Sequence, residues 1–322
     1  MINVAIVGAT GVVGRTLIDI INERQMFGFN YYLFSSKKSA GSYLTIGNKS
    51  LLVKELDVNN LPEKINFAFF CTKEQVSGKF IPYFLQNNAI VIDFSSYYRK
   101  NKPLIAPQIN FKSIKGNLIC NPNCSTIAGV MALYKVYEEF GLKTIIYSTY
   151  QAVSGAGKSA IDDLANNKSE FFKTPIKDNL IPKIGDFDKS GNSKEENKMV
   201  YETKKILGDK NIKISATCVR VPITIGHSLS INFQTAKKCS LNQIKEVIKS
   251  ANGVKLLKNE GLAMPILARN QDLVLVSRVR KSKIGANWFS LFVSSDNLRK
   301  GSAQNAIEIF EILLKKRFNK EG

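Results

Sequence analysis

The chain has 322 residues, of which 44% are hydrophobic and 22% charged. This composition excludes wholesale disorder and provides enough apolar residues for a sizeable core, more consistent with two domains than with one. The net charge of +20 would suit a nucleic-acid partner, but the basic residues are spread along the chain, without an Arg-rich arm or an aromatic–basic motif. We therefore expect no nucleic-acid partner, and the charge fits the handling of anionic substrates.

No run approaches the 18 apolar residues of a membrane helix, and the opening "MINVAIVGATG" lacks the basic leader of a signal peptide. The five cysteines are odd in number, and no pair has zinc spacing. His227 is the single histidine, which excludes a His-rich metal site. These features predict a reduced, cytoplasmic protein that binds no metal and no membrane.

The first motif is a glycine turn between an expected strand at residues 2–7 and the helical pattern "RTLIDIINER". Such a turn lets the backbone approach a pyrophosphate, whose charge the helix N-terminus faces. The spacing is GxxGxxG rather than GxGxxG, so a tight turn without a ligand is the alternative. The residues assigned to cofactor binding here are Gly8, Thr10, Gly11, Val12, Val13 and Gly14.

The second expected strand, "NYYLF" at 30–34, ends where an NAD-binding domain usually carries an acidic residue for the ribose hydroxyl. This chain has "SSKKSAG" there instead. Ser35, Ser36 and Lys38, with Lys37, offer hydroxyl groups and positive charge for a 2′-phosphate. The segment therefore favours NADP over NAD, and the alternative is a solvated basic loop.

Further apolar strands at 66–71 and 89–95 flank a helix expected over 74–87. Continuous apolar strands that alternate with helices indicate a doubly wound, Rossmann-type sheet, in which ligands bind beyond the carboxyl ends of the strands. "SSYYRK" comes directly after one of these ends and places Arg99 near the site. The alternative for Arg99 is an ordinary surface arginine.

The stretch "CNPNCSTIAGVMALYKVYEEF" changes from a polar turn to a helix expected over 125–140, with Cys124 at the junction. The partial positive charge of a helix N-terminus lowers the pKa of a cysteine, and its free N–H groups could receive an oxyanion. Asn123 adds a side-chain amide donor beside it. From placement alone, a nucleophile and a buried inert cysteine are equally good interpretations of Cys124.

The second half of the chain is dominated by strand patterns that alternate apolar and polar residues, which predicts a sheet with one covered face and an α+β domain. The expected strands are 143–153, 212–221, 227–235, 272–281 and 287–295, and the expected helices are about 158–172, 195–207 and 241–251. A last helix at about 299–318 should pack back on the first sheet. We therefore expect a cofactor domain at 1–122, completed by 299–322, and a catalytic and dimerisation domain at 123–298.

Several segments in one order resemble the bacterial type of aspartate-semialdehyde dehydrogenase, from Val7 to Ala306. They include "GATGVVGR", "SSYYRK", "NPNCST", "YQAVSGAG", "EENKMVYETKKIL", "CVRVPITIGHS" and "DNLRKGSAQNA". The resemblance implies a homodimeric enzyme that reversibly reduces L-aspartyl-4-phosphate to L-aspartate 4-semialdehyde and phosphate with NADPH. This reaction belongs to lysine, threonine and methionine biosynthesis.

The resemblance also implies residue roles. Cys124 matches the nucleophile that forms a thioester, and His227 matches the general acid/base. The substrate-binding residues that it implies are Gln151 for orienting the acyl group, Arg220 for the carboxylate, Glu195 and Lys198 for the amino group and the phosphate, and Arg99 and Asn123 for the phosphate. The remaining residues assigned to the cofactor are Ser154, Gly155 and Gly157, in a second glycine loop, and Asn297.

These assignments have plainer alternatives. A lone histidine is more often structural, and the odd separation of Arg220 and His227 would put them on opposite faces of one regular strand, unless Pro222 and Gly226 break it. Glu195 and Lys198, three apart on an expected helix, could be a surface ion pair, as could Glu202 and Lys205. "SGAG" could be a plain turn.

The chain also departs from the common family pattern. Gln108 stands where glutamate is usual, Leu229 where an acidic residue is common, and Lys38 where arginine is usual. Two rival functions stay open. N-acetylglutamyl-phosphate reductase shares the cysteine and histidine logic, although an amine-facing carboxylate such as Glu195 argues against its acylated substrate. A cofactor-binding regulatory protein without chemistry is the other.

Overall fold

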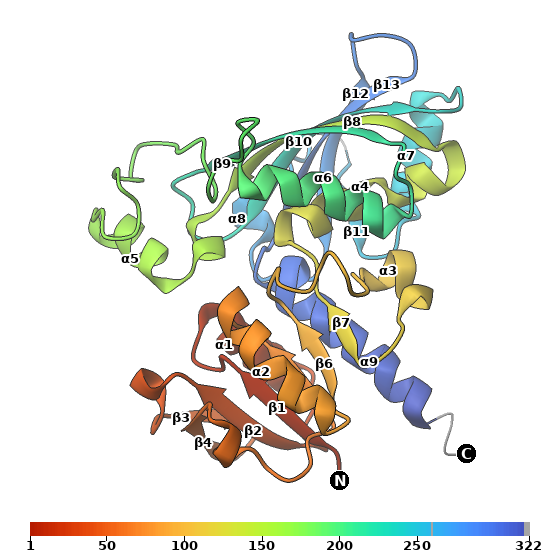
Figure 1. The fold of residues 1–322 in the computed structure, drawn as a ribbon. Coiled ribbons are helices and arrows are strands. Elements are labelled where there is room, and N and C mark those ends of the chain that lie inside the picture. Colours follow the sequence, from red (N-terminus) through yellow and green to blue (C-terminus); the bar gives the residue numbers. More distant parts are fainter. Residues whose placement is uncertain (259, 319–322) are drawn as a thin grey trace. The chain divides into compact units, whose positions relative to one another are not determined.

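The structure is a computed structural model that describes residues 1–258 and 260–318. The chain forms two compact units, which are Met1–Pro122 with the segment from Ser302 onward, and Asn123–Gly301 (Figure 1). The prediction of a doubly wound first domain and an α+β second domain is confirmed. Within the residues that the structure describes, no helix combines the length and the apolar character needed to cross a membrane.

The first unit contains a seven-stranded sheet in the order β3-β4-β2-β1-β5-β6-β7. All neighbours pair in parallel except β3, which pairs antiparallel with β4 at one edge. The strands are β1 (Asn3–Val7), β2 (Asn30–Ser35), β3 (Tyr43–Ile46), β4 (Lys49–Glu55), β5 (Phe67–Phe70), β6 (Ile90–Asp93) and β7 (Leu118–Cys120), and the helices are α1 (Val12–Glu23), α2 (Glu74–Gln86), α3 (Pro107–Asn110) and α9 (Gln304–Phe318).

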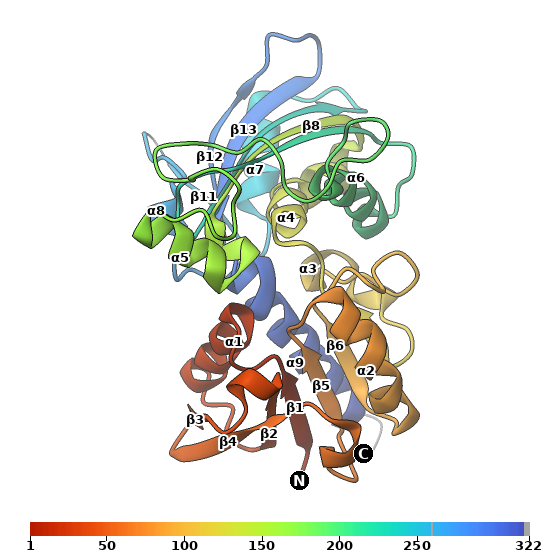
Figure 2. The same ribbon diagram turned by 60° about the vertical axis from the view of Figure 1, so that its left-hand side comes forward.

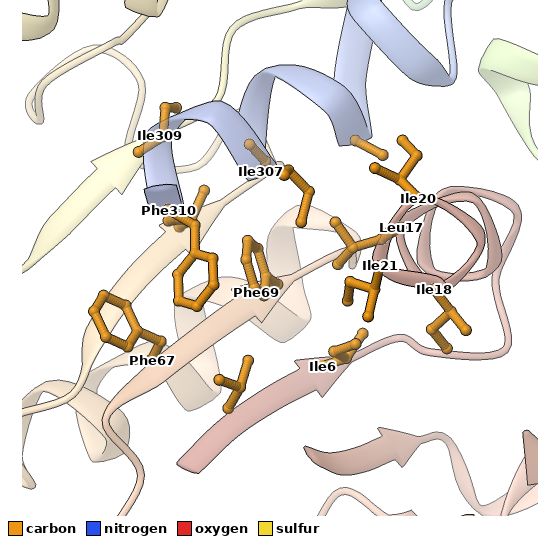
Figure 3. Packing of buried hydrophobic residues seen from close by; sticks show 14 of the residues in the cluster. Ile6, Leu17, Ile18, Ile20, Ile21, Phe67, Phe69, Ile307, Ile309 and Phe310 are labelled. Atoms are coloured by element: carbon orange, nitrogen blue, oxygen red, sulfur yellow. The ribbon is translucent and has the colours of Figure 1, made fainter. Parts of the chain in front are cut away.

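Both faces of this sheet are covered, which explains why its strands are apolar throughout. Ile6 packs in one cluster with α1 and α9, whereas Val7 packs in the other with α2. Figure 3 shows Phe310 of α9 against Phe67 and Phe69, with ring centroids 4.8 and 5.4 Å apart. The prediction that the last helix packs on the first sheet is therefore confirmed.

The second unit contains a six-stranded sheet in the order β11-β12-β13-β10-β8-β9. Helices α4, α6 and α7 contact one face of it (Figure 2). The strands are β8 (Leu142–Gln151), β9 (Lys213–Arg220), β10 (His227–Thr235), β11 (Val254–Leu256), β12 (Val274–Lys281) and β13 (Trp288–Ser295), and the helices are α4 (Cys124–Phe140), α5 (Lys158–Asn166), α6 (Lys194–Leu207), α7 (Leu241–Lys249) and α8 (Pro265–Ala268).

The topology of this sheet gathers three candidate residues at one edge. Strands β8 and β9 are parallel, and their ends place Gln151 opposite Arg220. Strand β10 runs antiparallel to β8 and begins at His227, beside the end of β8. Residues about 70 positions apart in the sequence therefore meet where two strands end and a third begins.

Two predicted helices differ in the structure. The helix expected over 158–172 ends at Asn166, because Asn167 adopts a left-handed conformation (φ 52°) and the Asp163 carboxylate accepts the backbone N–H groups of residues 170–172. The helix expected over 299–318 begins with a π-helical turn, Arg299–Ala303. There the N–H of Gly301 donates to the carbonyl of Asp296, five residues back, at 3.0 Å. The β3–β4 hairpin had not been predicted.

Candidate active site

Cys124 is the first residue of α4, and Asn123 caps this helix. The side-chain oxygen of Asn123 accepts the backbone N–H groups of Ser125 and Thr126 at 3.0 and 3.1 Å. The half-buried sulfur therefore lies at the positive end of a 17-residue helix, which favours the thiolate. The N–H groups of Ser125 and Thr126 already donate to Asn123, so the expectation that the helix N–H groups receive an oxyanion is wrong for these two.

His227 is fully buried and contacts the sulfur directly. Its Nε2 lies 3.2 Å from Sγ of Cys124, and its Nδ1 accepts the backbone N–H of Ala152 at 3.0 Å. Burial, reinforced by the positive charge of Arg220, lowers the pKa of His227 to about 3, although Glu195 acts in the opposite direction. The imidazole is therefore neutral at physiological pH.

Glu195 of α6 links the candidate substrate residues. One carboxylate oxygen accepts the side-chain amides of Asn123 and Gln151 at 2.8 and 3.0 Å, and the other lies 3.3 Å from Nζ of Lys198. Burial alone would raise the pKa of Glu195, but Lys198 and the two amides outweigh it and lower the pKa to about 2. The alternative of a surface ion pair is wrong, because Glu195 is 6% exposed.

Arg220, at the end of β9, is also buried, and its Nη1 donates to the carbonyl of Ala152 at 2.7 Å. A Cβ atom added to Gly155 would lie 3.2 Å from both Nη1 of Arg220 and Nε2 of His227. The two side chains thus flank one glycine. Arg220 and His227 can both lie beside Gly155 because the chain between them leaves the sheet. Arg220 is the last residue of β9, and His227 is the first residue of β10.

Asn297 fastens the second glycine loop to the turn before His227. Its side-chain oxygen accepts the N–H of Gly226 at 2.9 Å, and its amide group donates to the Ser154 hydroxyl at 2.9 Å. Gly157, with φ +96°, precedes α5 in a conformation that side chains rarely adopt. Ser154 and Asn297 therefore hold each other in place, and their contact with a cofactor stays a prediction.

In the first unit, the glycine turn between β1 and α1 has no room for a side chain at Gly8 or Gly14. A Cβ atom on Gly8 would lie 2.4 Å from the carbonyl oxygen of Cys71, and one on Gly14 would lie 2.2 Å from that of Gly8. Gly11 precedes α1 and gives it no side-chain cap, which leaves the first N–H groups of the helix to an anion. These features fit the pyrophosphate of a dinucleotide.

The other candidates of the first unit differ in exposure. Ser36 and Lys38 are exposed after β2, whereas Ser35 is buried and its hydroxyl donates to the carbonyl of Ser36 at 3.2 Å. Arg99 is 6% exposed, and its Nη2 donates to the carbonyl of Phe94 at 2.6 Å. The alternative of a surface arginine is therefore wrong, and its role at the phosphate stays a prediction.

Comparison with known proteins identifies the family. Residues 3–117 match the family model of the semialdehyde dehydrogenase NAD binding domain, and residues 133–300 match that of the semialdehyde dehydrogenase dimerisation domain. Aspartate-semialdehyde dehydrogenase of Aquifex aeolicus is 42% identical over 97% of this chain and 98% of that protein.

The chain belongs to the aspartate-semialdehyde dehydrogenase family. The crystal structure of aspartate-semialdehyde dehydrogenase II from Vibrio cholerae, complexed with ASA, covers 98% of each chain with a TM-score of 0.94 and 34% identity. The enzyme from Candida albicans, solved with NADP, covers 98% of this chain and 99% of its own with a TM-score of 0.81 and 24% identity, and shares the fold. The chain is accordingly an oxidoreductase with a nicotinamide cofactor.

Sequence reasoning missed one residue of this site, Glu202. The sequence suggested that Glu202 could form a surface ion pair with Lys205. Glu202 is instead fully buried, and its Oε2 accepts the backbone N–H of Asn123 at 2.7 Å. The sequence signal that could have identified Glu202 is its spacing from Glu195. Glu202 lies seven residues after Glu195, two helical turns along the same face of α6. Both carboxylates therefore face the start of α4.

Two of the departures from the family pattern, Gln108 and Leu229, lie outside the cofactor loop, and each fits its surroundings in the structure. Gln108 donates from Nε2 to a carboxylate oxygen of Glu308 at 2.9 Å, a contact that a glutamate could not make without like-charge repulsion. Leu229 is fully buried in β10, where an apolar residue needs no partner. Neither departure changes a residue to which a catalytic role is assigned.

Proposed function

We propose that the chain catalyses the reversible, NADP-dependent reduction of L-aspartyl-4-phosphate to L-aspartate 4-semialdehyde and phosphate through a thioester on Cys124. The observation that carries the proposal is the 3.2 Å contact between Sγ of Cys124 and Nε2 of His227 at the N-terminus of α4. The family places the same reaction in the aspartate branch of amino-acid biosynthesis, and we infer a cytoplasmic location.

The charges around the sulfur suit this substrate, which has a carboxylate, an ammonium group and an acyl phosphate. Arg220 presents a buried guanidinium for the carboxylate. Glu195, ionised at neutral pH, suits the ammonium group. Lys198 lies beside Glu195 with its side chain 20% exposed, so its ammonium group can also meet phosphate oxygens. The other residues proposed to bind the phosphate group are Asn123 and Arg99.

Covalent catalysis divides the reduction into two easier steps. In the biosynthetic direction the thiolate of Cys124 attacks the acyl carbon, the C–O bond to phosphate breaks, and a thioester forms. Gln151, held by Glu195 and by the hydroxyl of Thr149 at 2.9 Å, has a fixed amide with which to orient the acyl group. The nicotinamide cofactor, when bound, supplies the hydride that converts the thioester to the aldehyde.

The preference for NADP rests on the segment directly after β2. No acidic side chain stands at the end of this strand, and Ser36 and Lys38 are exposed there. The glycine turn of the first unit would hold the pyrophosphate through Gly8, Gly11 and the start of α1. The residues proposed for the nicotinamide end are Ser154, Gly155, Gly157 and Asn297.

The second unit is also the proposed dimerisation surface. Along β8, Ile145 and Tyr147 are buried, whereas Ile146 is half-buried and Tyr150 is 41% exposed. Tyr150 lies beside Phe292 of β13, with ring centroids 6.2 Å apart. This aromatic pair, on the sheet face that α4 does not contact, suits a homodimer interface. Light scattering should give twice the chain mass, and Tyr150→Asp should reduce it.

Two alternatives are weaker. An N-acetylglutamyl-phosphate reductase would have no ammonium group to place beside the ionised Glu195. A regulatory protein without chemistry would have no use for a cysteine at a helix N-terminus in contact with a buried histidine. Absorbance at the nicotinamide band tests both: aspartate semialdehyde, NADP and phosphate together should yield NADPH, and Cys124→Ser should remove this signal while the protein stays folded. No NADPH from the wild-type chain would refute the proposed function.

A further inference from the structure

The segment from Asp296 to Gly301 lies between β13 and α9, within the motif DNLRKGSAQNA. The buried carboxylate of Asp296 accepts three backbone N–H groups. Its Oδ1 accepts those of Leu298 and Arg299 at 2.9 and 3.0 Å, and its Oδ2 accepts that of Asn270 at 2.8 Å. A carboxylate at the start of a helical turn satisfies N–H groups that have no partner within the turn. Asp296 therefore holds this turn in one conformation and fastens it to the loop before β12.

The turn is π-helical, and this geometry decides where Gly301 lies. The N–H of Gly301 donates at 3.0 Å to the carbonyl of Asp296, five residues back, where an α-helix would use the carbonyl four residues back. The guanidinium of Arg299 pairs with Asp272 through Nε at 2.8 Å and through Nη2 at 3.3 Å. Asp272 belongs to the same loop before β12, so the turn is tied to that loop a second time. Gly301 is thus held in a fixed place.

Gly301 packs directly against Cys124. A Cβ atom added to Gly301 would lie 3.1 Å from Cβ and 3.4 Å from Cα of Cys124, and 3.3 Å from the carbonyl oxygen of Asp296. The atoms of Cys124 that it would meet belong to the start of a helix and not to the far end of a flexible side chain. The φ angle of Gly301 lies outside the left-handed region, and alanine is otherwise favoured over glycine in a helix. The glycine is therefore explained by lack of space beside Cys124 and not by backbone conformation.

The same segment also contacts the chain before His227. The side-chain oxygen of Asn297 accepts the N–H of Gly226 at 2.9 Å, and Gly226 directly precedes His227. Sγ of Cys124 and Nε2 of His227 are 3.2 Å apart. Asn297 and Gly301, four residues apart, therefore contact the two parts of the chain whose side chains meet at the sulfur.

We propose that Gly301 is a positioning residue for Cys124: its bare backbone, held by the π-helical turn, sets where Cβ and therefore Sγ of Cys124 lie. This inference rests on the proposed function, in which Cys124 is the nucleophile, and Gly301 acts through Cys124 and not on the substrate. Attack on a carbonyl carbon needs the sulfur at a defined distance and angle, and a misplacement of about 1 Å can lower the rate about 10²-fold. A side chain at position 301 would push Cβ of Cys124 away from the turn and carry Sγ with it.

Turnover kinetics of two alanine variants test the positioning role. Gly301→Ala should lower kcat about tenfold, because the sulfur shifts by a few tenths of an ångström, while the KM values for NADP and for phosphate stay within about twofold of the wild type. Gly285→Ala is the matched control, because the atom nearest to its new Cβ would be Cδ1 of Trp288 at 3.6 Å, an ordinary contact. A wild-type kcat in Gly301→Ala, a loss confined to the KM values, or an equal loss of kcat in Gly285→Ala would overturn the proposal.

Urea unfolding tests the same contact without turnover. Cys124→Gly removes the Cβ atom that the new methyl group would meet, so Gly301→Ala should lower the urea midpoint of the wild type more than that of Cys124→Gly. If Gly301→Ala alone does not fold, adding Cys124→Gly should restore folding. Equal shifts of the midpoint in both backgrounds, or a double variant that stays unfolded, would overturn the proposal. Absence of turnover in the wild-type chain would instead refute the proposed function, and the unfolding data would still decide whether Gly301 places Cys124.

Discussion

Glu202 accepts a hydrogen bond from the backbone N–H of Asn123, the residue directly before Cys124, at 2.7 Å. The carboxylate is fully buried, so the bond is shielded from water. Asn123 is in turn the cap of α4 and donates its side-chain amide to Glu195 at 2.8 Å. The carboxylates of Glu195 and Glu202, both on α6, therefore hold Asn123, the residue that caps α4 directly before Cys124.

Removing the Glu202 carboxylate should displace Cys124. Glu202→Ala leaves the buried N–H of Asn123 without its acceptor, which should cost about 1–3 kcal/mol of stability. It should also lower kcat, measured as NADPH formation, because Asn123 directly precedes Cys124 and would lose the contact that holds it. Glu202→Gln, whose side-chain oxygen can still accept the bond, is the matched control and should stay close to the wild type. Equal kcat values in all three proteins would contradict this role.

A single methyl group at Gly155 should block the site. In Gly155→Ala the new Cβ would lie 3.2 Å from Arg220 Nη1 and from His227 Nε2, so one of these side chains must shift. We expect a fall in kcat/KM of at least roughly tenfold, equivalent to about 1.4 kcal/mol, with little change in Tm. Gly28→Ala is the control, because its Cβ would meet nothing within 4 Å. Two variants with the same kcat/KM would show that Gly155 does not border the reacting groups.

His227 should make stability depend on pH. Its pKa is about 3 in the folded chain and about 6.5 for an unperturbed histidine, as in the unfolded chain, so the unfolded chain binds more protons between these pH values. The stability that neutral His227 contributes is present above pH 6.5 and is lost as the pH falls towards 3, by at most about 1.4 kcal/mol per pH unit. Urea unfolding across this range should show a shallower slope for His227→Gln than for the wild type, and identical slopes would refute the shift.

Lys38 should set the preference between cofactors. It is exposed directly after β2, where a 2′-phosphate would lie. We expect Lys38→Ala to raise the KM for NADP roughly tenfold while the KM for NAD changes little, since NAD lacks that phosphate. Lys177→Ala, which removes an exposed lysine far along the chain, controls for net charge. A parallel change for both cofactors would remove Lys38 from phosphate recognition.

Local sequence patterns were enough to predict the fold and the first elements of the site. The glycine turn between a strand and a helix, and Cys124 at a change from turn to helix, are both determined by neighbours in the sequence. Partners of the site residues were not predictable in this way. The Ala152–His227 bond depends on β8 lying beside β10, and the Asn123–Glu202 bond on α6 packing against α4, so both arise from pairings across 75 and 79 residues. The early end of α5 was missed because Asp163 captures the N–H groups that would have continued it.

The thioester on Cys124 is tested most directly by omitting phosphate. With aspartate semialdehyde and NADP alone, we expect a burst of one NADPH per chain, followed by arrest, because the acyl group stays on the sulfur until phosphate removes it. Mass spectrometry should find this adduct on the peptide that contains Cys124, and adding phosphate should restart NADPH formation. Continuous NADPH formation without phosphate, or a full burst from Cys124→Ser, would contradict a thioester on Cys124.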